Sequence, residues 1–180
     1  MDERFKQVEM MLHLVRPTAE LKEAALEYKK EHLAFGETEI SGSELLDQMD
    51  FYEEWLATVT NNTSPETVNP EWVVADTFFA INEAGRIVGI IDLRHTLNDF
   101  LQDYGNSGYS VRPSERRKGY ATEMLRQVKE VARDAGMTKL HMATFCDNIG
   151  SVKTIIKNGG VSEREFVAEG RPARMYVITL

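Results

Sequence analysis

The chain has 180 residues, of which 42% are hydrophobic and 28% charged, and this composition excludes a wholly disordered or fibrous protein. Its formal net charge of -8 disfavours a general affinity for nucleic acid or for an anionic membrane. A single cysteine excludes an internal disulfide, and no metal-ligand cluster has a recognisable spacing. Without a secretory signal or a long apolar run, the chain is expected to be one cytoplasmic domain spanning residues 1–180.

The N-terminal part of the chain predicts a strand followed by two helices. The apolar run over residues 10–15 stops at a proline and predicts the strand. Apolar residues recur at helical spacing over 19–33, which predicts an amphipathic helix. Ser41 and Glu44 have the spacing of a capping box, and the apolar stripe over 45–56 predicts that a second helix follows them.

The remainder predicts a loop, six more strands and two more helices. The polar segment 58–70 contains two prolines and is expected to be a loop. Strands are expected at 72–81, 87–93, 107–112, 140–145, 161–168 and 174–180, and helices at 120–135 and 149–156. Strands with helices on both faces make a mixed α/β sheet.

The segment RPSERRKGYA, residues 112–121, is strongly basic in an acidic chain. It lies between a strand end and a helix start, where free backbone N–H groups and the helix dipole favour an anion. Gly119 has no side chain to hold off a phosphate. The segment therefore predicts a phosphate-bearing ligand, and the alternative is a solvated basic helix start. Neither a P-loop nor a dinucleotide-binding glycine motif is present.

Two motifs resemble the signatures of the GNAT superfamily of N-acetyltransferases. Residues 116–121, RRKGYA, match the pattern Arg/Gln-x-x-Gly-x-Gly/Ala, and residues 148–151, NIGS, followed by 157–160, KNGG, are similar to the second signature. The resemblance implies a GNAT-like fold, with a mostly antiparallel central sheet and helices on both faces. It also implies that acetyl-CoA is the cosubstrate and that the enzyme transfers acetyl to a primary amine by direct attack.

The resemblance further implies which residues hold acetyl-CoA. The main chain of Tyr109, Ser110 and Val111 would pair with the pantetheine arm, and one of its N–H groups would polarise the thioester carbonyl. The pyrophosphate would be held by Arg116, Arg117, Lys118, Gly119, Tyr120, Ala121 and Thr122, and the other side of the arm by Asn148 and Ser151.

The catalytic residues depart from the family pattern. Many members place a tyrosine seven residues after the signature asparagine, where this chain has Ile155. Tyr176 and Tyr109 are candidate acids for the leaving thiolate, although strand tyrosines are commonly core residues. His95, beside Asp92 at the end of a predicted strand, is a candidate base or a structural strand end. Ile155 also motivates an alternative function, a regulatory module that binds acyl-CoA without turnover.

The acceptor and the association state stay open at this point. Acidic residues of the two-helix region would attract a cationic amine or form solvated faces: Glu37, Glu39, Glu44, Asp47 and Asp50. Both a small-molecule amine and a peptide amine fit this pattern. The apolar residues 176–178 would pair two copies as a homodimer or close the core.

Overall fold

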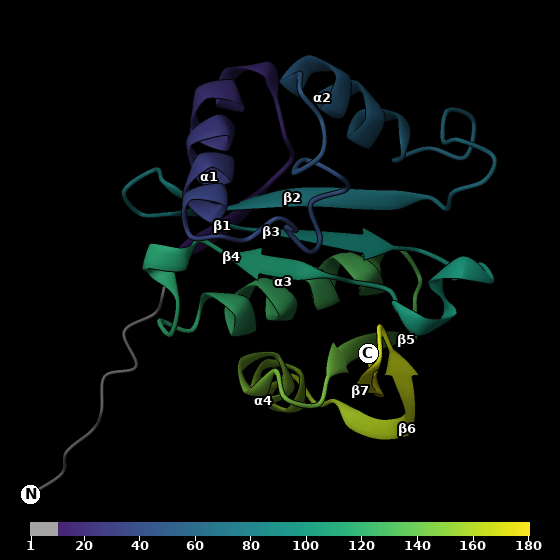
Figure 1. Ribbon diagram of the computed structural model, residues 1–180. Helices are drawn as coiled ribbons and strands as arrows, with labels where there is room; N and C mark the ends of the chain where they lie inside the picture. Colours follow the sequence, from purple (N-terminus) through teal and green to yellow (C-terminus); the bar gives the residue numbers. More distant parts are fainter. Residues whose placement is uncertain (1–10) are drawn as a thin grey trace, which may run out of the picture.

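The computed structural model describes residues 11–180, so Met10 of the first expected strand lies outside the described residues. Figure 1 shows the elements, which are β1 (Leu12–Val15), η1 (Ala19–Leu21), α1 (Lys22–Ala34), α2 (Tyr52–Asn61), β2 (Ala75–Asn82), β3 (Ile87–Arg94), η2 (Phe100–Asp103), β4 (Tyr109–Val111), η3 (Pro113–Glu115), α3 (Tyr120–Asp134), β5 (Lys139–Phe145), α4 (Ile149–Lys157), β6 (Val161–Ala168) and β7 (Arg171–Thr179). None of the helices in this described part is long and apolar enough to cross a membrane.

The strands form two sheets whose neighbours are all antiparallel. One has the order β1-β2-β3-β4 and the other β5-β7-β6. The sheets meet at an isolated bridge between Gly105 and Met142, while β4 and β5 share no ladder. The mostly antiparallel α/β architecture is confirmed, and the division into two sheets leaves an edge of β4 at the boundary between them.

Helices α1 and α2 cover one face of the larger sheet (Figure 1). Tyr28 of α1 and Trp55 of α2 pack with Phe79, Ile87 and Ile90 of the sheet in one buried cluster. Trp55 is fully buried, and its indole N–H donates to the carbonyl of Ser43 at 2.8 Å. This bond ties the chain before α2 to the helix itself.

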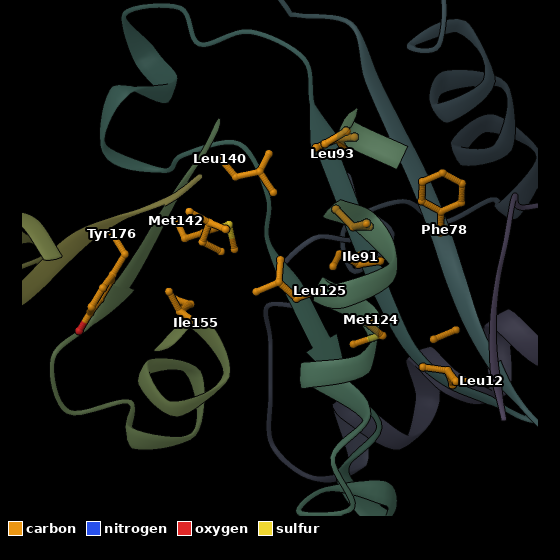
Figure 2. Close-up of a cluster of buried hydrophobic side chains, with 14 of the residues drawn as sticks. Leu12, Phe78, Ile91, Leu93, Met124, Leu125, Leu140, Met142, Ile155 and Tyr176 are labelled. Carbon is orange, nitrogen blue, oxygen red and sulfur yellow. The ribbon is translucent and has the colours of Figure 1, made fainter. Parts of the chain in front are cut away.

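Helix α3 covers the opposite face, where a second cluster reaches from one sheet to the other (Figure 2). Ile91 lies in this cluster although its neighbour Ile90 lies in the first, because successive side chains of a strand point to opposite faces. Leu125 of α3 and Ile155 of α4 extend the cluster to the second sheet. Both faces of strand β3 are covered, which explains its apolar residues from Ile87 to Ile91.

The second helix begins later than its sequence pattern predicts. The helix expected over 45–56 is instead α2, which starts at Tyr52 and continues into the expected loop as far as Asn61. Glu44 and Leu45 have φ of +49° and +68°, so the apparent capping box starts no helix. Gly42 lies so close to β4 that a Cβ there would stand 2.2 Å from the carbonyl oxygen of Gly108. This tertiary contact overrides the local helical pattern.

The last strand does not form a free edge. β7 lies between β5 and β6, and it begins at Arg171 rather than at 174. Tyr176 and Ile178 are 3% and 1% exposed. Of the two alternatives for residues 176–178, the structure shows that these residues close the core.

Candidate functional site

One edge of β4 faces the boundary between the two sheets. The carbonyl of Gly108 accepts from the N–H of Asp92 at 3.1 Å, and the N–H of Arg112 donates to Val88 at 2.8 Å, so these residues pair toward β3. Because backbone groups alternate along a strand, Tyr109 and Val111 turn their N–H and carbonyl groups away from β3. Such an edge is suited to pair with an extended ligand.

The loop after β4 leads into α3 with an unusual backbone. Arg117 and Gly119 have φ of +62° and +88°, and Gly119 is the N-cap of α3 without a side-chain cap bond. The first N–H groups of α3 therefore have no capping side chain as their acceptor. Left-handed residues ahead of a helix N-terminus form an anion-binding concavity, so this backbone fits a phosphate group.

The three cations of the loop differ in their contacts. A guanidinium nitrogen of Arg116 lies 2.7 Å from Glu37, and the ammonium of Lys118 lies 2.7 Å from Glu115. Arg117 is exposed and forms no ion pair with any residue in the range 11–180. Of the three cations of this loop, Arg117 is therefore the one whose charge no described carboxylate neutralises.

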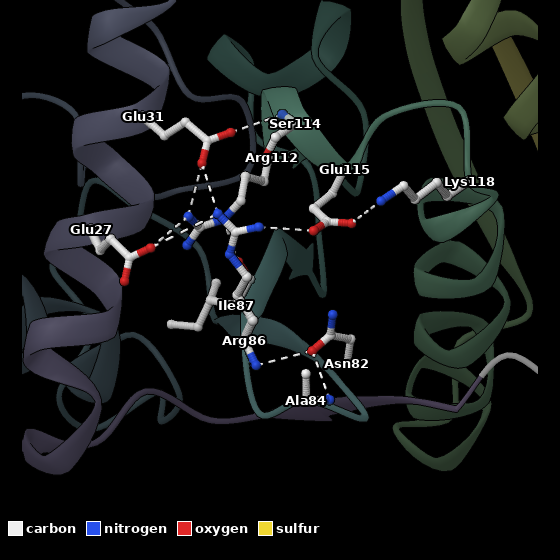
Figure 3. A network of polar contacts seen from close by, with 10 residues as sticks. All are labelled: Glu27, Glu31, Asn82, Ala84, Arg86, Ile87, Arg112, Ser114, Glu115 and Lys118. Carbon is white, nitrogen blue, oxygen red and sulfur yellow. Dashed lines mark hydrogen bonds and ion pairs between the residues drawn. The ribbon is translucent and has the colours of Figure 1, made fainter.

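An ionic network around the buried Arg112 anchors the loop to α1 (Figure 3). Arg112 is 1% exposed and lies 2.9 Å from Glu31 and 3.1 Å from Glu27. Glu31 also accepts the backbone N–H of Ser114 at 2.8 Å. Burial raises the pKa of Glu31, but the hydrogen bonds from Ser114 and Arg112 outweigh burial and lower that pKa to about 2. Sequence analysis missed Glu27 and Glu31, because their helical spacing resembles that of any solvated helix face.

Three predicted residues from distant segments meet across the boundary. The hydroxyl of Tyr109 on β4 lies 2.8 Å from Oγ of Ser151 on α4. The side chain of Asn148 caps α4 by accepting the N–H of Ser151 at 3.2 Å. Burial raises the pKa of Tyr109 to about 12 although hydrogen bonds with Ser151 and Thr154 lower it, so the phenol keeps its proton at neutral pH.

The other two candidate catalytic residues lie elsewhere. Nε2 of His95 is 2.7 Å from a carboxylate oxygen of Asp76, and the second oxygen of Asp76 is 2.7 Å from Arg16. Tyr176 lies in the core, opposite Met142 in the ladder between β5 and β7 (Figure 2). Neither residue forms a described contact with Tyr109.

A cavity of about 700 Å³ adjoins the start of β4. Three segments line it, namely 39–48, 71–75 and 94–104, and the first of these packs on β4 through Gly42 and Gly108. The wall carries both carboxylates and exposed rings: Glu39, Glu44, Asp47, Glu71, Trp72, Phe100 and Tyr104.

A carboxyl pair lies at the wall of this cavity nearest β4. Asp92 is fully buried; one oxygen accepts the N–H of Gly108 at 2.6 Å, and the other lies 3.0 Å from Nε of Arg94 outside hydrogen-bonding alignment. Glu44 lines the cavity and contacts Asp92. Burial and the neighbouring Asp92 raise the pKa of Glu44 to about 8, which Arg94 partly offsets. No sequence signal links these carboxyls, because their contact depends on the fold.

The chain is similar to a known acetyltransferase family in sequence and to known acetyltransferases in fold. The family described as acetyltransferase (GNAT) domain matches residues 12–161. No curated protein sequence matches the chain significantly. YncA from Salmonella typhimurium, solved with its cofactor acetyl-CoA, is similar in structure with a TM-score of 0.66 and 14% identity, over 94% of both chains.

Two further solved structures are similar at the level of the fold. RimL, a ribosomal alpha-N-protein acetyltransferase in complex with coenzyme A, has a TM-score of 0.66 and 15% identity, over 94% of both chains. SpeG, a spermidine/spermine N-acetyltransferase from Vibrio cholerae, has a TM-score of 0.64 and 12% identity, over 93% of both chains. At these identities the similarity is one of fold.

Proposed function

The chain belongs to the GNAT acetyltransferase family, with acetyl-CoA as the cosubstrate, and we propose that it acetylates a primary amine by direct attack on the thioester. One observation carries this proposal. The outward edge of β4 lies between an anion-binding loop at one end and the acidic cavity at the other. That order suits a donor with phosphates, an extended arm and a reactive end.

The residues present fit acetyl-CoA. Backbone N–H groups over 117–121 would hold the pyrophosphate, with the guanidinium of Arg117 beside it. The main chain of Tyr109 and Val111 would pair with the pantetheine arm, and residues 148–151 would close on its other side. Arg116 and Lys118 would contribute charge around the phosphates from their positions beside Glu37 and Glu115.

In the proposed reaction the lone pair of a neutral amine forms a C–N bond with the thioester carbonyl carbon. An outward N–H of β4 stabilises the oxyanion that develops on the carbonyl oxygen. The attached nitrogen then loses a proton to solvent and the C–S bond breaks, which gives the amide. The thiolate of CoA takes its proton from the Tyr109 hydroxyl, which regains one from solvent. With a pKa of about 12, the phenol of Tyr109 carries a proton at neutral pH that it can donate.

Tyr109 replaces the acid that the family pattern places on α4. Ile155 is fully buried and has no proton to donate, which is the observation behind a regulatory module without turnover. The hydroxyl of Tyr109 nevertheless reaches the same helix, at Ser151. This contact favours the enzyme over the regulatory module.

The proposal is tested by titrating the protein with acetyl-CoA and measuring CoA release with candidate amines. We expect micromolar binding and amine-dependent release. Gly119→Val, which places a β-branched side chain at φ +88°, should abolish binding, and circular dichroism checks that the variant folds. Unchanged affinity in a folded variant would reject the loop assignment. Binding without release for any amine would support the regulatory module.

For Tyr109→Phe we expect kcat to fall about 10- to 100-fold, because general acid catalysis contributes on that order or more. The affinity for acetyl-CoA should stay within twofold, since the main chain of this residue is unchanged. Single-turnover CoA release measures the effect. The same assay on Tyr176→Phe and His95→Gln tests the other two candidates. A full rate in Tyr109→Phe would exclude this residue as the acid.

A further inference from the structure

The cavity beside β4 is lined by two chemically different kinds of side chain, charged groups and aromatic rings. Glu44 and Arg94 line it near β4, with the buried carboxyl of Asp92 behind them. Glu39, Asp47 and Glu71 add further carboxylates to the wall. One arginine against this number of carboxyl groups makes the cavity a site for a cation rather than for an anion.

Aromatic rings form another part of the cavity wall. Phe100 and Tyr104 are 73% and 52% exposed, and their rings stack with centroids 5.1 Å apart. Trp72 is 38% exposed and lines the same cavity. Arg164 of β6 binds the carbonyl of Gln102 at 2.9 Å, which fixes the short helix that carries these rings. Large exposed rings that gather in a cavity indicate an apolar binding partner.

We propose that the acceptor is a primary amine carried on an aromatic group, with its ammonium at the Glu44–Asp92 pair and its ring among Trp72, Phe100 and Tyr104. This inference rests on the proposed function and names its substrate class. A linear polyamine would use the carboxylates but leave the rings without a partner. An arylalkylamine would contact the carboxylates through its ammonium and the aromatic side chains through its ring.

The carboxyl pair also provides the proton acceptor that the reaction needs. An ammonium N–H transfers its proton to the carboxylate of Glu44, and the freed lone pair attacks the thioester carbon. The charged groups that face Glu44 are Asp92 and Arg94 of β3. Since burial and the neighbouring Asp92 both raise the pKa of Glu44, its base form becomes populated only as the pH approaches 8. Glu44 then releases this proton to solvent, and the attached nitrogen loses its second proton as the amide forms.

The test measures kcat/KM for 2-phenylethylamine, n-butylamine and spermidine with the full-length protein. We expect 2-phenylethylamine to exceed the other two at least tenfold. In Phe100→Ala/Tyr104→Ala this preference over n-butylamine should fall below about threefold, while the rate with n-butylamine is retained. Retention of that rate shows that the variant is folded and that its acetyl-CoA site is intact.

A second variant tests the role of the Glu44 carboxyl group independently of the aromatic rings. Glu44→Gln should lower kcat at least 100-fold for every amine and remove the rise of the rate toward pH 8. Glu54→Gln, on the exposed face of α2, is the matched control and should leave both unchanged. Acetyl-CoA affinity should be equal in all three proteins.

The possible outcomes distinguish a wrong substrate class from a wrong proposed function. Amine acetylation without a preference for the aromatic amine, or a preference that survives removal of both rings, overturns the substrate class and leaves the proposed function standing. Acetyl-CoA binding without acetylation of any of the three amines also overturns the substrate class. Absence of acetyl-CoA binding overturns the proposed function itself, independently of the amine panel.

Discussion

Glu31 illustrates how a residue outside every motif supports the candidate site. Its carboxylate holds Arg112, Arg86 and the N–H of Ser114 together at the end of β4 (Figure 3). Arg112 is almost fully buried, and a buried cation is tolerated only when its partners are in place. The carboxylates of α1 therefore hold the beginning of the loop between β4 and α3 in place.

This network predicts how stability depends on pH. Because the pKa of Glu31 is about 2 in the folded state and near 4.5 when unfolded, the stabilisation is complete above about pH 5 and is lost as the pH falls toward 2. Denaturant unfolding from pH 6 to pH 2.5 should show this decline.

Glu31→Gln provides the comparison for that measurement. The variant should be less stable at pH 6 and lose less stability on acidification, because it lacks the carboxylate. Glu54→Gln, whose side chain is exposed, is the matched control and should follow the wild type. Equal pH dependence in wild type and Glu31→Gln would show that Glu31 does not carry the effect.

At the level of elements, the segment between α1 and α2 forms one wall of the cavity beside β4. Residues 39–48 form turns instead of a helix, and Gly42 brings them into contact with β4. Ser110 reinforces the contact by donating its hydroxyl to the carbonyl of Ser41 at 2.9 Å. Glu44 reaches Asp92 because its backbone adopts a left-handed conformation at this point.

Gly42→Ala tests this contact. Its Cβ would stand 2.2 Å from the carbonyl oxygen of Gly108, so the segment must move away from β4. We expect kcat/KM for the amine to fall more than tenfold while the affinity for acetyl-CoA stays within twofold. Gly85→Ala is the matched control, because Gly85 also has positive φ, +75°, but no atom within 4 Å of the added Cβ. Equal effects of both variants would indicate backbone strain alone.

At the level of the whole molecule, the two sheets share a core but leave the edge of β4 without a strand partner. Clusters on α3 and α4 join the sheets on one side, and the bridge from Gly105 to Met142 joins them at one end. The pantetheine arm, in the proposed function, pairs with this edge as an additional strand. Ligand binding would then stabilise the fold as well as supply the acetyl group.

Acetyl-CoA at 100 times its Kd should therefore raise Tm by about 5–10 °C. Such saturation contributes about 2.7 kcal/mol, and 1 kcal/mol corresponds to about 2–4 °C for a protein of this size. Hydrogen exchange should show new protection at the amides of Tyr109 and Val111 and at residues 117–121. Protection confined to α1 and α2 would contradict pairing along β4.

The sequence by itself determined the family and the order of most elements, and it predicted a phosphate-binding loop. These features depend on local patterns: hydrophobic periodicity, turn glycines such as Gly136, and the contiguous motif over 116–121. The strands expected at 72–81 and 87–93, found as β2 and β3, and the helix from Tyr120 were confirmed for this reason. Local patterns are readable because the residues that cause them are neighbours in the chain.

Only the tertiary structure decided the split between the sheets, the late start of α2 and the Glu44–Asp92 pair. Each depends on contacts between segments far apart in the chain, such as Gly42 against Gly108. The position of the Tyr109 hydroxyl depends on such a contact as well. It reaches Ser151 of α4 from β4, whereas the family pattern places a tyrosine on α4 itself. Packing and burial set these distances and the pKa of each buried acid, and no local pattern encodes them.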